Sequence, residues 1–211
     1  GIISTKHPDA GVIERALDVG LADERSRVRA SVMQAFPEQV SERCDLDLLR
    51  RVYQAPDGEE EWVLLAPLLS AQGHDCLLEL WETKTSYTAR RVDVWRVIDE
   101  ALDLNEAEHI RCWRYLISEP PYLPDDVPSA DEIERAEQWS QLVVEVGQPL
   151  TSDAGVWLRE DMRGDVVAAY SSFIKLGTSP YLSERCHDVA LALAYEFSAR
   201  RLASLGYVEA C

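Results

Sequence analysis

The stretch SADEIERAEQWSQLVVEV, residues 129–146, has the features of a long α-helix. Ser129 is followed three residues later by Glu132, and this spacing is the capping box that begins many helices. Apolar residues then recur three and four positions apart, as they do on one face of a helix. We therefore predict a helix that begins beside Ser129 and ends near Val146.

Helical spacing continues through nearly the whole chain. Asn105 and Glu108 form a second capping-box pattern, whereas strand-like alternation is brief and no Asn-Gly hairpin signal occurs. Gly20 is a plausible stop for the first helix, and Pro67 predicts a kink or an early break in the fourth. We predict an all-α fold of about ten helices. They are expected near residues 8–19, 23–36, 45–53, 59–71, 75–83, 88–102, 105–118, 129–146, 153–176 and 180–205.

The helices fall into antiparallel hairpins of roughly 32 to 35 residues, which raises the question of a repeat. Residues 12–14 (Val-Ile-Glu) align with residues 77–79 (Leu-Leu-Glu) at an offset of 65, and Arg25 then aligns with Arg90. Other positions at this offset disagree. Two architectures therefore remain open: an irregular helical bundle and a short HEAT-like stack of hairpins.

The 211 residues, of which 46% are hydrophobic, are enough for a substantial core. We expect residues 1–211 to form a single all-α domain. Residues 119–128 contain four prolines and several acidic residues, so they are expected to form an extended connector rather than a helix. No apolar run approaches the roughly 18 residues of a membrane span, and no signal peptide is recognised at the start.

Acidic residues greatly outnumber basic ones. Lysine and arginine total 21, aspartate and glutamate total 38, and the formal net charge is −17. This charge disfavours binding to nucleic acids and to anionic membranes, and it favours a basic protein partner. An acidic surface also improves solubility without any partner, and that alternative stays open.

The acidic residues are concentrated in the middle of the chain, around residues 119–145. We predict that this region binds a basic partner, with a nearby tryptophan as an apolar anchor. The predicted contact residues are Asp125, Asp126, Asp131, Glu132, Glu134, Glu137 and Trp139. The competing interpretation is a solvated connector followed by a well-capped helix. Of the six tryptophans, four or five are expected to be mainly buried.

Two Glu-x-x-His motifs offer an alternative of another class. Glu106 precedes His109, and Glu184 precedes His187, by three residues. Two such motifs with two further glutamates would build the di-iron site of a ferritin-like oxidoreductase. The further glutamates would be Glu79 and either Glu145 or Glu160. Both motifs also fall in predicted first turns, where acidic residues favour the helix start without any metal.

The five cysteines are widely spaced and lack a C-x-x-C pair. This usage indicates reduced thiols and a cytoplasmic protein rather than a disulfide scaffold. A zinc site is a weaker alternative, because the close His and Cys residues fall on or beside predicted helices. Its ligands would come from His74 with Cys76, His109 with Cys112, and Cys186 with His187.

Signals for other chemistry are missing from the sequence. There is no Gly-x-Ser-x-Gly elbow and no glycine-rich phosphate loop, so we expect binding rather than catalysis, and no cofactor. By analogy of charge and size alone, the chain suits an immunity protein or inhibitor that neutralises a basic protein. A HEAT-like interaction scaffold is the further alternative.

Overall fold

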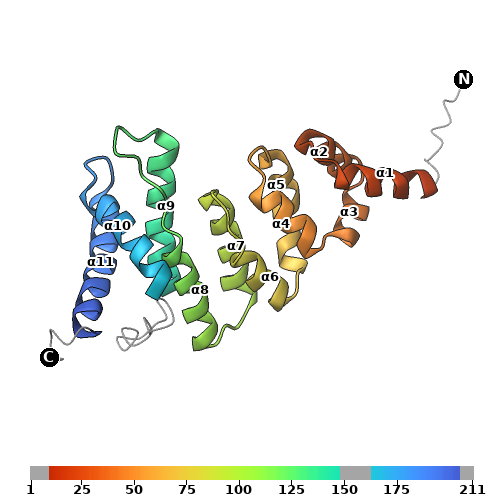
Figure 1. Ribbon diagram of the computed structural model, residues 1–211. Helices are drawn as coiled ribbons and strands as arrows, with labels where there is room; N and C mark the ends of the chain where they lie inside the picture. The colour runs from red at the N-terminus through yellow and green to blue at the C-terminus, as the bar shows by residue number, and fades with distance from the viewer. Residues whose placement is uncertain (1–9, 148–162, 205–211) are drawn as a thin grey trace, which may run out of the picture. The chain divides into compact units, whose positions relative to one another are not determined.

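The computed structural model describes residues 10–147 and 163–204. Within these residues every regular element is helical, which confirms the predicted all-α class (Figure 1). None of the described helices has the length and apolar character needed to cross a membrane. The elements are α1 (Ala10–Ala22), α2 (Ser26–Ala35), α3 (Pro37–Arg43), α4 (Leu46–Gln54), α5 (Glu59–Leu65), the 3-10 helix η1 (Ala66–Ala71), α6 (His74–Trp81), α7 (Thr88–Ala101), α8 (Glu106–Ser118), α9 (Ala130–Gly147), α10 (Arg163–Thr178) and α11 (Glu184–Ser204).

The chain divides into two compact units, Gly1–Ala101 and Leu102–Cys211. Their boundary lies between α7 and α8 rather than in the proline-rich segment 119–128. That segment joins α8 to α9, which pack against each other inside the second unit. The segment contains no helix, as expected. A single domain over residues 1–211 stays a prediction, and each unit is considered by itself.

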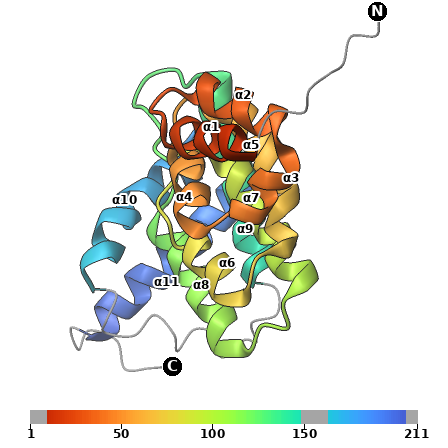
Figure 2. The same cartoon turned by 90° about the vertical axis from the view of Figure 1, so that its right-hand side faces the viewer.

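The first unit contains three helical hairpins: α1 with α2, α4 with α5, and α6 with α7. Between hairpins, α2 packs on α5, α4 on α6, and η1 on α7; α2 and α5 lie side by side in both views (Figures 1 and 2). Side chains pair at a near-constant interval, 32 residues from Arg29 to Glu61 and 31 from Trp62 to Asp93. The first unit is therefore a stack of hairpins. The 65-residue offset in the sequence corresponds to about two of these steps.

Prolines and glycines in the first unit act partly as expected. The α-helix ends at Leu65 and continues as η1, which confirms the break predicted from Pro67. Pro37 ends α2 but also occupies the first position of α3, a helix that the sequence analysis missed. Gly20 does not end α1, which continues to Ala22. Gly20 is buried where Val32 of α2 leaves no room for a side chain.

A buried ion pair joins the first two hairpins. Arg29 of α2 donates from Nε and Nη2 to the carboxylate of Glu61 on α5, at 2.5 and 3.0 Å. Its Nη1 donates to the backbone carbonyls of Asp23 and Glu24, at 2.6 and 2.8 Å. The side chains of Arg29 and Glu61 are 4% and 0% exposed. One guanidinium thus fixes α2, the preceding loop and α5 relative to one another.

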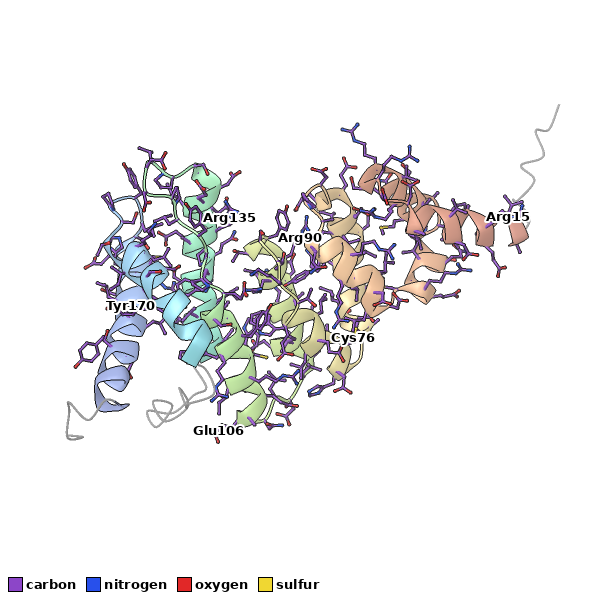
Figure 3. All side chains as sticks on the ribbon, viewed as in Figure 1. Arg15, Cys76, Arg90, Glu106, Arg135 and Tyr170 are labelled. Carbon is purple, nitrogen blue, oxygen red and sulfur yellow. The ribbon has the colours of Figure 1, made fainter. Side chains whose placement is uncertain are left out.

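A second buried arginine joins the next two hairpins. Arg90 of α7 donates from Nη1 to the backbone carbonyls of Val52, Tyr53 and Ala55, at 2.7, 3.0 and 2.9 Å (Figure 3). These carbonyls lie at the C-terminal end of α4, where a helix has no internal donors for them and carries partial negative charge. The guanidinium also lies over the Tyr87 ring, 4.1 Å from its centroid.

In the second unit, α8 packs on α9 and α10, and α11 packs on α9 and α10. The capping box at Asn105 is confirmed, and α8 begins at Glu106. The last helix begins later than predicted, at Glu184. Its cap is Ser183, whose Oγ accepts from the Cys186 amide at 3.2 Å. Pro180 lies in the preceding turn, and residues 153–162 of the predicted ninth helix lie outside the described residues.

Replacing Glu61 by Gln should lower the free energy of unfolding of the first unit by about 3 kcal/mol, because the Arg29 charge stays buried without a counter-charge. Urea unfolding followed by circular dichroism measures this change. Glu60 is the matched control, because it is the adjacent exposed residue of α5. Glu60→Gln should change stability by less than about 0.5 kcal/mol. Equal effects of the two substitutions would contradict the role of the ion pair.

Candidate functional site

The predicted acidic contact residues divide into two groups. Glu132 belongs to the first, because it closes a capping box at the start of α9. Its carboxylate accepts from the Ser129 amide at 2.7 Å and from the Ser129 hydroxyl at 2.8 Å. These hydrogen bonds to Ser129 lower the pKa of Glu132 from its usual 4.5. Glu132 therefore stabilises the helix end, in agreement with the competing interpretation of this stretch.

Two further members of the predicted set have internal partners. Glu137 of α9 accepts from both the amide and the hydroxyl of Ser183, each at 2.6 Å, and so anchors the start of α11. Asp125 forms an ion pair with Lys175 of α10. These bonds join the middle of α9 to the start of α11, and the segment before α9 to the last turns of α10.

The prediction that Trp139 contacts a partner is wrong. The side chain is only 1% exposed, so a partner cannot reach it. Its indole Nε1 donates to the Leu116 carbonyl at 3.1 Å, and its ring stacks on Phe173 with centroids 5.9 Å apart. The burial follows from the i, i+3 apolar spacing of α9, which places Trp139 on the same face as Ala136 and Leu142. Trp62, Trp81 and Trp95 are also buried.

The second group of acidic residues lies along the outer side of α9. Asp131, Glu134 and Glu145 are exposed, and their spacing puts them on one face together with Gln138 and Gln141. We call these five residues the α9 stripe, which extends over about 21 Å of helix. Arg135 donates to the backbone carbonyl of Asp131 at 3.1 Å. Within the described residues, the three carboxylates of the stripe form no ion pair.

Asp126 is exposed in the segment that leads to α9. Within residues 119–147, the exposed carboxylates without an ion pair that we consider further are Asp126 and those of the α9 stripe. Of the seven predicted contact residues, this set keeps Asp126, Asp131 and Glu134. It adds Glu145, whose carboxylate accepts from Gln141 at 2.7 Å. The stripe can be recognised in the sequence because its residues recur three and four positions apart, as they do on one face of a helix.

The metal alternatives find no support in the geometry. No three His, Cys, Asp or Glu side chains within residues 10–147 and 163–204 are placed to hold a metal ion. The proposed ligand pairs Glu106 with His109 and Glu184 with His187 each lie in the first turn of their helix (Figure 3, Glu106). The His187 Nε2 lies 2.6 Å from the Ser179 carbonyl. Both motifs thus occupy helix starts, and Glu160 lies outside the described residues.

The cysteines have the properties of buried thiols. Cys44, Cys76, Cys112 and Cys186 form no disulfide within the described residues, and the last two are buried. Burial raises the pKa of Cys44 to about 11, with further effect from Asp45, and burial likewise raises the pKa of Cys186 to about 11. These two thiols therefore stay protonated at neutral pH, and the protonated form is a poor metal ligand and a poor nucleophile.

A groove in the first unit was not anticipated from the sequence. It lies between α5 with η1 on one side and α7 on the other, and its volume is about 420 Å³. Its lining combines apolar and charged side chains: Glu59, Trp62, Val63, Ala66, Pro67, Asp93, Arg96 and Val97. Sequence reasoning assigned residues 59–71 to one helix with a kink or an early break at Pro67. Val63 and Pro67 are apolar residues exposed in that stretch, and they are the signal that the sequence reasoning missed.

The two walls of the groove run in parallel. Arg90 lies 3.6 Å from Glu59, and Trp62 Nε1 donates to the Asp93 carboxylate at 2.8 Å, so residue numbers rise together along α5 and α7. Asp93 also pairs with Arg96 at 3.4 Å. The Trp62 indole is thereby fixed at the base of the groove.

No family model, no curated protein and no solved structure matches the chain. The candidate sites are therefore judged on geometry and charge.

Replacing Glu132 by Ala should lower the melting temperature at pH 7, since α9 loses its charged capping partner. The folded pKa of Glu132 is below its usual 4.5, so its contribution is complete above that pH and is lost as pH falls through the folded pKa. Thermal melts from pH 7 down to pH 2 should therefore show the gap between variant and wild type narrowing in acid. A gap that widens toward low pH would contradict the assignment.

Proposed function

We propose that the chain is an acidic protein-binding module that docks the α9 stripe and Asp126 onto a basic surface of another protein. The observation that carries the proposal is the α9 stripe: exposed carboxylates in line along one helix, with no ion pair to neutralise them within the described residues. A rigid helix holds such charges at fixed spacing, which favours recognition of a matching row of Lys and Arg.

The balance of buried charge supports the same proposal. The buried charged residues among those described are Arg29, Arg90, Arg91 and Glu61. Burial therefore removes more positive than negative charge, and the accessible surface is more acidic than the sequence total of −17 implies. A surface of this sign accelerates association with a basic protein and repels nucleic acid.

An inhibitor or immunity protein that covers the basic groove of its target would use a surface of this kind. We propose this role, and a cytoplasmic location, for the chain. The four described cysteines form no disulfide among themselves, which supports a reducing compartment. The partner is defined by its chemistry: a protein with clustered Lys and Arg side chains.

The test uses two variants of equal charge. Asp131→Asn, Glu134→Gln and Glu145→Gln together neutralise the α9 stripe, whereas Glu14→Gln, Glu38→Gln and Glu42→Gln remove three exposed carboxylates from the first unit. The immobilised proteins capture partners from cell lysate at about 0.1 M salt and again at about 0.5 M, where screening is stronger. A captured basic protein is then purified, and its association rate is measured with each variant.

The stripe variant should slow association about tenfold and flatten its salt dependence, and the control variant should match wild type. Equal slowing by both variants would show that only total charge matters. Unchanged association of the stripe variant would remove α9 from the interface. Capture of acidic proteins, or of nothing at either salt concentration, would contradict the proposed partner class.

A further inference from the structure

We infer that the groove between α5 with η1 and α7 is a second docking site, for a segment of another protein that carries Lys or Arg beside a large apolar side chain. This site lies in the first unit and involves none of the residues of the α9 stripe. It therefore adds a distinct recognition element to the proposed function.

The apolar part of the groove faces solvent without a partner. Val63 is 64% exposed, Pro67 is exposed as well, and Val97 is half-buried on the opposite wall. Single exposed apolar residues are common, but here two exposed residues and one half-buried residue, from α5, η1 and α7, line one hollow. A Leu, Ile or Met side chain of a partner would bury its surface against all three.

The charged part of the groove selects a cationic segment. Glu59 lines the groove with its side chain 75% exposed, and Glu60 lies on the same face of α5 as Val63. Glu59 pairs with Nη2 of the buried Arg90 at 3.6 Å, and its carboxylate still reaches solvent. Two carboxylates at the start of α5 are therefore open to a partner's Lys or Arg.

The exposed guanidinium of Arg96 makes the two ends of the groove opposite in charge. Because α5 and α7 run in parallel, Arg96 lies toward the η1 end of the groove, away from Glu59. A bound segment would place its cationic residues toward Glu59 and its uncharged or acidic end toward Arg96.

Hydrogen bonds within the first unit hold the base of the groove in place. The hydrogen bond from Trp62 to Asp93 fixes its base, and the adjacent residue Glu61 is held by Arg29 from the other side of α5. A preformed site loses little conformational entropy on binding, so even a short segment can gain affinity there.

The test measures fluorescence anisotropy of three labelled peptides with the full chain. Each peptide has about twelve residues, enough for three helical turns. One is a helix-forming Lys–Leu peptide, the second replaces Leu by Ser, and the third replaces Lys by Glu. The inference predicts that the Lys–Leu peptide binds at least about tenfold more tightly than the other two.

Val63→Ser is the decisive variant and Val12→Ser its control, since Val12 of α1 is 60% exposed and lies outside the groove. Val63→Ser removes apolar contact without changing charge, so it should weaken Lys–Leu binding about tenfold, whereas Val12→Ser should not. The triple substitution in the α9 stripe should leave this affinity unchanged, which separates this inference from the proposed function.

A second measurement uses the wild-type chain alone. Addition of the Lys–Leu peptide should shift the NMR resonance of the Trp62 indole N–H, which is assigned by Trp62→Phe. The inference would be overturned if the indole resonance does not shift or if the Lys–Ser peptide binds as tightly as the Lys–Leu peptide. It would also be overturned if both valine variants lose the same affinity, or if the Kd of the Lys–Leu peptide lies above about 1 mM.

Discussion

The buried ion pair between Arg29 and Glu61 is the contact on which the rest of the first unit depends. A buried carboxylate is costly unless a counter-charge and hydrogen bonds satisfy it, and Arg29 supplies both. The same guanidinium binds two carbonyls of the loop before α2. The geometry thus admits one register between α2 and α5. Trp62, the next residue, donates a hydrogen bond to Asp93 on α7 and so aligns the third hairpin with the second.

This internal use of arginine links stability to the proposed function. Arg29 and Arg90 are directed into the protein, where they bind carboxylate and carbonyl oxygens between hairpins. Their burial leaves carboxylates to dominate the accessible surface, and the α9 stripe in the second unit has no cation paired with it in the described chain. The arrangement that stabilises the fold is therefore also the one that favours a basic partner.

Local sequence signals predicted the features that depend on neighbouring residues. The capping boxes at Asn105 and Ser129, and the break at Pro67, arise from hydrogen bonds and backbone restrictions within one turn, so the sequence contains all that determines them. Features that depend on distant contacts were missed or misassigned. Gly20 lies inside α1, where Val32 of α2 leaves no room for a side chain, and α11 starts at Glu184 because Glu137 binds its cap.

The candidate sites show the same difference between features set by neighbouring residues and features set by distant contacts. Asp131 and Glu134 were predicted from the concentration of acidic residues in the middle of the chain, whereas Glu145 of the same face was not in the predicted set. The burial of Trp139 follows from packing against Phe173, 34 residues away in sequence. The groove beside Trp62 requires two helices whose pairing no local pattern specifies. The Glu-x-x-His motifs were ambiguous because helix starts favour acidic residues with or without a metal.

A double-mutant cycle on the Arg29–Glu61 pair tests the central claim most directly. Arg29→Met, Glu61→Leu and the double variant are compared by urea unfolding of the whole chain. The account predicts that the double variant loses much less stability than the sum of the single losses, with a coupling energy of at least about 2 kcal/mol. Additive losses, within about 0.5 kcal/mol, would contradict the claim that this pair holds the hairpins in register.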